Sequence, residues 1–327
     1  MRLASTRTRT AMVGALSAIA LGVPLATAPA NAGTAAPDEA VQAAAVQLGG
    51  HWAPFSRCPV DDPAMLAADG RTLIPTCVSS YSPSGSIKLG RTTTPTTWTD
   101  LQFGVIQNTV EKTFTVVPAP AGSLLAAPAE IPGGLLGLAC PPDVPVVTGI
   151  CELLTDNTLN RVVAKVESAG APRDYDLTAG YGNGKPIVTV PIRIKLENPF
   201  LGDKCYIGSN ATPILLKPQN LAFPKVAVQR FDGNGTPNTA GSMLRFALTE
   251  KNQGDSTFTV PKASGCGLGG ILNGAIDLKT GLPSPSGANS LLLNNTSTYS
   301  GGLTSPASVL PDAGKVLSQN WHSAQTS

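Results

Sequence analysis

The clearest pattern of apolar and polar positions lies between Ile187 and Leu196, where the two kinds of residue alternate. A period of two predicts a β-strand with one face buried and the other face in water. Pro191 falls inside this stretch, and because proline has no N–H to donate, we expect an edge position or a bulge there. The apolar face contains Val188, Val190, Ile192, Ile194 and Leu196, and the polar face contains Thr189, Arg193 and Lys195.

Shorter stretches repeat this pattern and are separated by clusters of Pro, Gly and Asn, which are typical of turns. Many short strands of this kind predict an all-β fold, a β-sandwich. One short helix is expected from Val146 to Leu159, where Ile150, Leu153 and Leu154 recur at partly helical spacing. The other expected strands lie at 92–99, 101–105, 113–117, 162–166, 244–248 and 258–260.

The sequence leaves two domain organisations open. No repeat of fixed period is visible, which argues against a propeller or a solenoid. Each half of the chain contains cysteines and strand patterns, so one sandwich and two β modules are both compatible with it. The expected organisation is a signal peptide at 1–32, a flexible segment at 33–50, β modules at 51–142 and 143–310 that can form one sandwich, and a polar tail at 311–327.

The first 32 residues have the pattern of a secretory signal peptide. Three arginines precede an apolar run from Ala11 to Leu25, and Ala30-Asn31-Ala32 supplies the small residues of a cleavage site. The run is short for a bilayer of about 30 Å, so we expect cleavage rather than a membrane anchor. The mature chain has no second apolar span. We therefore expect a secreted protein, extracellular or held non-covalently at the cell envelope.

Export changes the interpretation of the six cysteines, because thiols outside the cytosol tend to pair. Six cysteines allow 15 pairings, and the sequence does not choose among them. Order along the chain suggests bridges that each stabilise the fold by about 3 kcal/mol. No C-x-x-C pair is present, so a zinc site is not expected. The suggested pairs are Cys58–Cys77, Cys140–Cys151 and Cys205–Cys266.

The stretch from Thr113 to Pro142 contains one formal charge, Glu130, among many apolar residues. Apolar residues of this kind usually lie inside a protein, crossing the core or covering an open end of the sandwich. An exposed loop that touches a lipid or a protein partner is the functional alternative, which burial of the stretch would exclude. The possible interaction surface comprises Leu124, Leu125, Ile131, Leu135, Leu136 and Leu138.

Charge and composition exclude several functions. The chain has 23 basic and 21 acidic residues, and without Arg2, Arg7 and Arg9 of the leader the balance is 20 − 21 = −1. Such a nearly neutral chain has no overall electrostatic footprint for nucleic acid or for an anionic membrane. His51 and His322 are the only histidines, and no G-x-S-x-G elbow is present, which argues against a serine hydrolase. No cofactor or metal site is expected.

Two neighbouring acid pairs, Asp61-Asp62 and Asp174/Asp176, keep a hydrolase in consideration, because two carboxylates can cleave a glycosidic bond without histidine. Acids beside proline are usually solvated turn residues. A glycosidase pair also comes from distant strands as a rule, so these pairs identify no catalytic residue.

Several stretches resemble a family of secreted actinobacterial proteins that has no assigned activity. The resemblance runs through most of the mature chain, and it implies Gram-positive export and a mostly β domain with disulfides. It implies no site residue. The stretches are ENPFLGDKCYIGSN at 197–210, CPVDDPAMLAADG at 58–70, SPSGSIKLG at 82–90, DLQFGVIQN at 100–108, IPGGLLGLACP at 131–141 and GLPSPSG at 281–287.

The function expected from these observations is an exported, non-enzymatic protein with a binding or structural role at or outside the cell envelope. Its partner is an envelope component or a protein that the sequence does not identify. A secreted hydrolase with two carboxylates is one alternative. A carrier of a hydrophobic ligand is another, and it would need an apolar cavity inside the sandwich.

Overall fold

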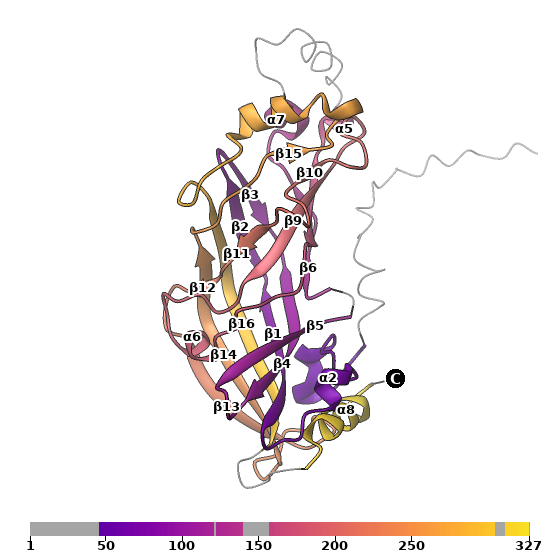
Figure 1. Cartoon of the computed structure of the whole chain (residues 1–327), viewed down its shortest axis with the longest axis vertical. Helices are drawn as coiled ribbons and strands as arrows, with labels where there is room; N and C mark the ends of the chain where they lie inside the picture. The colour runs from indigo at the N-terminus through magenta and orange to yellow at the C-terminus, as the bar shows by residue number, and fades with distance from the viewer. Residues whose placement is uncertain (1–45, 121, 140–156, 305–310, 327) are drawn as a thin grey trace, which may run out of the picture. The chain divides into compact units, whose positions relative to one another are not determined.

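Antiparallel strands form two sheets that pack as a sandwich, as the strand patterns predict (Figure 1). The computed structural model describes residues 46–120, 122–139, 157–304 and 311–326. All of these residues belong to one unit, Pro37–Ser327. The signal peptide predicted at 1–32 and the proposed Cys140–Cys151 bridge lie outside the described residues.

The larger sheet has ten strands, and its central path runs β12-β14-β16-β1-β4-β5. Strand β13 pairs with β14, β2 pairs with β16 and β3, and β6 pairs with β4. The strands are β1 (Leu73–Ser82), β2 (Ser84–Leu89), β3 (Thr92–Thr96), β4 (Thr99–Asn108), β5 (Thr113–Pro118), β6 (Leu124–Ala126), β12 (Gln219–Asn220), β13 (Lys225–Phe231), β14 (Met243–Asp255) and β16 (Ser290–Thr304).

The smaller sheet has six strands in the order β15-β10-β9-β8-β7, with β11 also paired to β9. Its strands are β7 (Ala129–Glu130), β8 (Val163–Ser168), β9 (Val190–Glu197), β10 (Tyr206–Ile207), β11 (Ile214–Leu216) and β15 (Ala263–Ser264).

Short helices cover the ends of the sandwich. Figure 1 places α7 and α5 at one end and α2 and α8 at the other. The described helices are α2 (Pro63–Leu66), α3 (Gly134–Ala139), α5 (Asn157–Asn160), α6 (Leu177–Tyr181), α7 (Asn273–Thr280) and α8 (Ala313–Ser323), with 3₁₀ helices η1 (Gly50–Phe55) and η3 (Leu268–Gly270).

The helix expected at Val146–Leu159 falls largely outside the described residues; α5 begins near its end. The structure contains more helices than the single one expected. Several of them are only four to six residues long, as in α2 and α3. Helices this short have too few turns to produce a recognisable apolar stripe.

Strand β9 confirms the alternation found in the sequence. Ile192, Ile194 and Leu196 are buried, while the residues between them are partly exposed. The edge position expected from Pro191 is wrong, because β9 lies between β8 on one side and β10 and β11 on the other. Strand β8 ends at Ser168, opposite Ile192. The carbonyl of Pro191 accepts the N–H of Ala169, just past this end. Because β8 has already ended there, the missing N–H of the proline interrupts no hydrogen bond between β8 and β9.

Strands from both sides of residue 142 lie in the larger sheet, since β14 and β16 pair alongside β1 and β4. The stretch 311–327, expected as a polar tail, contains helix α8. Leu317 and Trp321 lie four residues apart on this helix and are both buried, and the Trp321 indole N–H donates to the Phe55 carbonyl at 2.8 Å. One apolar side chain per turn is enough to dock an otherwise polar helix.

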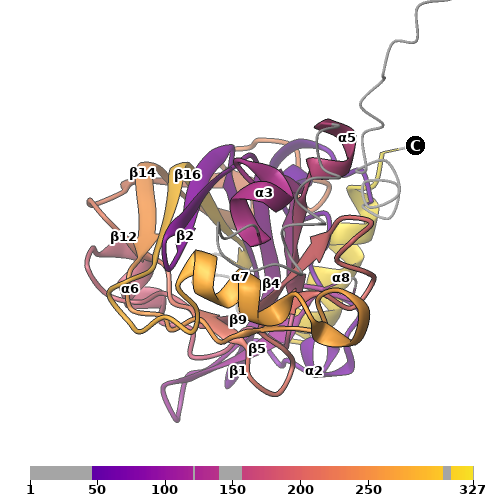
Figure 2. The same ribbon diagram turned by 90° about the horizontal axis from the view of Figure 1, so that it is seen from above.

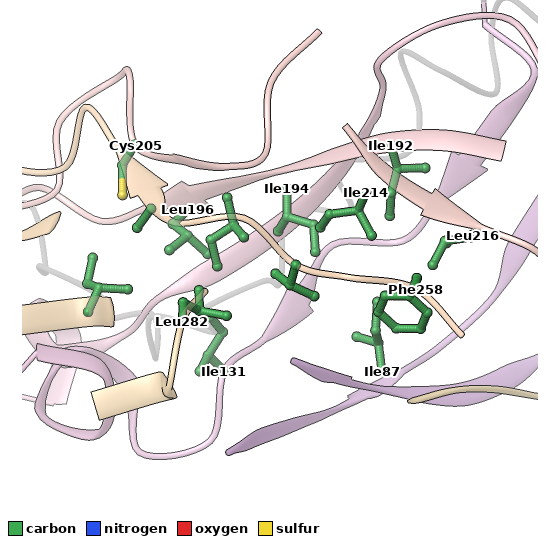
Figure 3. Close-up of a cluster of buried hydrophobic side chains, with 14 of the residues drawn as sticks. Ile87, Ile131, Ile192, Ile194, Leu196, Cys205, Ile214, Leu216, Phe258 and Leu282 are labelled. Atoms are coloured by element: carbon green, nitrogen blue, oxygen red, sulfur yellow. The ribbon is translucent and has the colours of Figure 1, made fainter. Parts of the chain in front are cut away.

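Buried apolar side chains form two clusters. The first, here called the aliphatic core, lies between the sheets and consists mainly of Ile, Leu and Val from both (Figure 3). The second, here called the aromatic core, gathers Trp52, Phe55, Phe231 and Trp321 beside η1, α2 and α8. Of the disulfides between described residues, Cys205–Cys266 lies in the aliphatic core and Cys58–Cys77 in the aromatic core. Both bridges join the pairs suggested by chain order.

Candidate functional site

An apolar cavity of about 100 Å³ lies inside the aliphatic core, between the two sheets. Strand β9 forms one wall with Ile192, Ile194 and Leu196, whose side chains point away from the solvent face of the smaller sheet (Figure 3). Strands β2, β3, β6 and β16 of the larger sheet form the opposite wall. The remaining lining residues include Ile131, Leu138, Val166, Ile207, Leu216 and Thr280.

Small side chains explain why space remains here. Ala126, Ala129 and Ala164 line the cavity where larger aliphatic residues would fill it. Ala164 lies opposite Leu196 in the β8·β9 ladder, and directly opposed residues of an antiparallel pair share one face of the sheet. Its methyl group therefore points into the cavity beside the Leu196 side chain.

Threonines supply the polar groups of the lining. Thr92, Thr94 and Thr96 alternate along β3 and so face the same side, and Thr99 and Thr280 line the cavity from β4 and α7. The Thr280 hydroxyl donates to the Ile276 carbonyl within α7 at 2.6 Å. The Thr96 hydroxyl oxygen is buried and has no hydrogen-bond partner in the described part of the chain. A buried hydroxyl without a partner destabilises the fold by about 1–3 kcal/mol, which a ligand with a polar atom would relieve.

None of the described residues that line the cavity is ionisable. These residues supply no general acid or base that could activate the threonine hydroxyls, and most of the contact they offer is non-polar. Its volume is below the 150 Å³ or so of an engineered apolar cavity that holds benzene, and far below the roughly 300 Å³ at which drug-sized pockets begin. The space fits the end or a short length of a hydrocarbon chain.

The stretch that the sequence singled out contributes to this cavity. Leu124, Ile131 and Leu138 line it, and Leu135 is buried beside it in the aliphatic core. The hypothesis of an exposed interaction surface is thus corrected for Ile131, Leu135 and Leu138, because the two sheets and α3 bury them. Leu124 and Leu125 are half-buried in β6, and Leu136 is exposed on α3.

The only histidine–carboxylate contact among the described residues lies near the aromatic core. His322 Nε2 is 3.0 Å from both carboxylate oxygens of Asp61, and the Ser318 hydroxyl donates to Asp61 at 2.7 Å. Burial raises the pKa of Asp61, but the bonds from Ser318 and His322 outweigh it and hold this pKa below its usual value. A catalytic triad needs the serine bonded to the histidine, whereas here both bond to the acid. The cluster fastens α8 to the residues before α2.

The acid pairs have structural partners. Asp62 caps α2 by accepting the Ala64 N–H at 2.8 Å. Asp176 caps α6 by accepting the N–H groups of Thr178 and Ala179 at 2.8 and 3.1 Å. The Thr178 hydroxyl and these backbone groups lower the pKa of Asp176, although partial burial opposes them. A carboxylate held ionised by three donors is suited to capping rather than to protonating a leaving group.

One amine is buried away from the cavity. Lys251 lies at an irregularity between β14 and β16, and its Nζ donates to the Leu248 carbonyl at 2.8 Å, to the Thr298 hydroxyl at 3.0 Å and to the Thr296 carbonyl at 3.4 Å. Burial lowers its pKa to about 8. Because these bonds use all three N–H donors, the amine is held as a structural group.

Within the described ranges, no cluster of three or more His, Cys, Asp or Glu side chains is arranged to hold a metal ion. No helix of the described part has the length and apolar character needed to cross a bilayer.

The chain was compared with protein-family models, with curated proteins and with solved structures. None of the three comparisons found a match. The cavity is therefore interpreted from its own geometry.

Sequence reasoning identified Leu124, Ile131 and Leu138 as unusual but missed the cavity that they line. Its other walls come from β3, β8, β9 and β16, which are separated by long stretches of chain. The available signal was the run of threonines at 92–99, which predicted a strand but not its inward-facing hydroxyls.

Proposed function

We propose that this protein is exported and, without catalysing a reaction, binds an apolar chain in the cavity between its sheets, at or outside the cell envelope. The cavity carries the proposal, because the described residues that line it are aliphatic residues and threonines, none of them ionisable. A binding site for a hydrocarbon needs this lining, whereas a hydrolase needs acids or bases at the substrate.

The leader at 1–32 and the disulfides support the exported location. Both Cys58–Cys77 and Cys205–Cys266 are compatible with an oxidising compartment. The resemblance to secreted actinobacterial proteins points the same way. The envelope is also a plentiful source of hydrocarbon chains, which gives the cavity a ligand of matching chemistry.

Calorimetric titration of the purified, oxidised protein with straight-chain alkanoic acids of increasing length tests the proposal. Binding is expected to strengthen with chain length until the cavity is full, since each buried methylene contributes about 0.8 kcal/mol. Ala164→Leu fills the cavity with three further carbons beside Leu196, so we expect it to weaken binding at least about tenfold, or about 1.4 kcal/mol.

Ala227→Leu is the matched control, because it makes the same change on β13, where Ala227 is exposed. It should bind like the unaltered protein. Thr96→Val sharpens the result: if the Thr96 hydroxyl holds the polar end of the ligand, this near-isosteric change weakens binding of the acid but not of an alkane. Absence of any alkyl-chain binding, or equal binding by Ala164→Leu, would contradict the proposal.

A further inference from the structure

Apolar side chains lie on two opposite sides of helix α7 and of the two residues just before it. Leu272 before its first turn, Ile276 and Thr280 are spaced by four residues and are buried against the aliphatic core. Ile271 and Leu278, seven residues apart, lie on the other side and are 58% and 63% exposed. An amphipathic helix on a protein surface normally turns a polar face to water. The outer face of α7 instead exposes Leu278 next to Lys279, and Ile271 just before the helix adds a second exposed apolar side chain, which points to a contact outside this chain.

A neighbouring turn extends this apolar face. Leu268 in η3 is 96% exposed, although leucine is among the residues most often buried. Gly267, Gly269 and Gly270 around it all have positive φ, so the backbone turns tightly there. The Cys205–Cys266 bridge fixes the start of this turn to the aliphatic core. The structure thus holds the leucine outward on a constrained loop.

Helix α3 lies against α7 (Figure 2) and adds the partly exposed Leu136. With Leu268, Ile271 and Leu278 it makes four exposed apolar side chains, here called the apolar tip. Both helices also reach the cavity, α3 through Leu138 and α7 through Thr280. The apolar tip consists of Leu136, Leu268, Ile271 and Leu278.

Basic residues lie on or beside the elements that carry the apolar tip. Four exposed cations lie there, and none of them forms an ion pair with another residue in the described ranges. Two acids are nearby: Asp203, which is exposed, and Asp277, which accepts the Ala263 N–H at 2.8 Å. Among these six described residues the positive charges are in excess. The cations are Lys204 beside Cys205, Lys262 beside Ala263, Lys279 on α7, and Arg91, whose backbone N–H donates to the Thr280 carbonyl at 2.7 Å.

We propose that the apolar tip docks on the surface of an anionic lipid bilayer, with its leucines and isoleucine in the outer part of the hydrocarbon and the surrounding cations at the headgroups. Apolar side chains ringed by Lys and Arg are the pattern of proteins that lie on such a surface. A standard protein–protein interface uses about 20–30 residues from each partner. The apolar tip has only four apolar side chains, which favours a lipid surface over a second protein.

This inference rests on the proposed function, because the bilayer is the source of the chain that enters the cavity. The two sites share α3 and α7, so a docked tip places the cavity next to the lipid that supplies it. The side chains that dock and those that line the cavity are nevertheless different residues, which allows the two ideas to be tested separately.

Flotation of the oxidised protein with phosphatidylcholine vesicles, with and without phosphatidylglycerol, tests the docking. We expect binding to the anionic vesicles, weakened by salt because the electrostatic part is screened. The triple variant Leu268→Ser/Ile271→Ser/Leu278→Ser should lose at least about tenfold in vesicle affinity. Its unfolding curve should match that of the unaltered protein, because the three side chains are exposed.

The matched control is Phe223→Ser/Val226→Ser/Val228→Ser, which removes exposed apolar side chains on and beside β13. This control should keep full vesicle binding. Equal binding by the tip variant, or no binding of the unaltered protein to either vesicle, would overturn the docking. A self-association seen by sedimentation velocity and lost in the tip variant, without vesicle binding, would assign the face to a second copy and also overturn it.

Alkanoic acid titrations separate the two proposals. A tip variant that still binds alkanoic acid but not vesicles supports docking as a distinct step. A variant Ala164→Leu that binds vesicles normally but does not bind alkanoic acid also supports docking as a distinct step, because only the cavity has been changed. Binding of alkanoic acid by neither the unaltered protein nor the tip variant, with vesicle binding intact, would remove the cavity function and leave the docking surface.

Discussion

The two cores of the sandwich are built on different principles. The aromatic core packs Trp52 between Phe55 and Phe231, with edge-to-face ring centroids at 5.9 and 5.4 Å. Its indole groups also donate to backbone carbonyls, Trp52 to Gly233 and Trp321 to Phe55. The aliphatic core has Ile, Leu and Val from two sheets and contains the cavity. None of the buried residues of the aromatic core lines that cavity.

The difference shows that one fold can combine a core whose packing is tightly constrained with a core that tolerates changes in side-chain volume. Large rings with directed N–H groups have few ways to pack and hold η1, α8 and the ends of the large sheet together. Aliphatic side chains from two sheets have no such bonds, and alanines at the lining leave room between them. We therefore expect the aromatic core to resist change and the aliphatic core to accept it.

The largest expected effects compare the disulfide of each core. Cys205→Ala/Cys266→Ala opens a loop with a sequence separation of 61, and Cys58→Ala/Cys77→Ala one of 19. The restriction of the unfolded chain predicts losses of about 4 and about 3 kcal/mol in the free energy of unfolding. Urea unfolding of the two variants measures this. A larger loss at the shorter loop would show that packing in the aromatic core, not loop length, decides the order.

A buried amine between β14 and β16 allows this part of the larger sheet to be probed by pH. The pKa of Lys251 is lowered from 10.5 to about 8 by burial. Below pH 8 or so both the folded and unfolded chains hold this proton, so the cost of the buried charge is fully present. Between pH 8 and 10.5 the folded chain loses the proton before the unfolded chain does. The destabilisation by the buried charge is thereby removed, and the free energy of unfolding rises by about 3 kcal/mol.

The measurement is the difference in unfolding free energy between Lys251→Met and the unaltered protein at neutral and at strongly alkaline pH. We expect Lys251→Met to lose about 3 kcal/mol relative to the unaltered protein as the pH rises, because only the latter gains. Lys279→Met, at an exposed position, controls for the loss of one amine. Parallel pH profiles for Lys251→Met and the unaltered protein would contradict the burial argument.

Enlarging one side chain in each core should change the free energy of unfolding in opposite directions, which tests the comparison directly. A methyl group added at Gly301 would lie 2.6 Å from two ring atoms of Phe55 in the aromatic core. Gly301→Ala is therefore expected to lose about 2 kcal/mol in unfolding free energy. Ala164→Leu adds three carbons in the aliphatic core, yet it fills existing space and should raise stability by up to about 1 kcal/mol. Equal losses in thermal unfolding would mean that both cores are filled alike.

The sequence predicted one core better than the other. The alternation at 187–196 identified the inner face of β9, since each apolar residue reports on the same wall. The aromatic core draws Trp52, Phe55, Phe231 and Trp321 from segments far apart in the chain, and isolated aromatic residues have no period. Trp321 in particular stood in a polar stretch, and only the fold shows its indole bonded to Phe55.

The candidate site was less predictable than the fold. A cavity is a difference between the volume that the sheets enclose and the volume that side chains fill, and no single stretch records this difference. Ala164 and Thr96 look ordinary in their own strands. They become informative only because the sandwich brings β8 and β3 to the same space.

The smallest expected effects compare two helix caps, one beside each core. Asp62 caps α2, whose Met65 is buried in the aromatic core, through one N–H. Asp176 follows Tyr175, which packs on the aliphatic core, and accepts two N–H groups and the Thr178 hydroxyl. Losing a cap costs about 1 kcal/mol, so Asp62→Ala should lose about 1 and Asp176→Ala up to about 2 kcal/mol.

Urea unfolding of each alanine variant beside its asparagine counterpart separates capping from charge. Asparagine keeps an accepting oxygen, so Asp62→Asn and Asp176→Asn should stay within a few tenths of a kcal/mol or so of the unaltered protein. A loss with Asn as large as with Ala would mean that the negative charge, not the accepted hydrogen bonds, matters at that position. That outcome at Asp176 alone would make this carboxylate a candidate for the acid–base chemistry of a hydrolase. Near-native stability of both asparagine variants would instead assign the two carboxylates to capping α2 and α6.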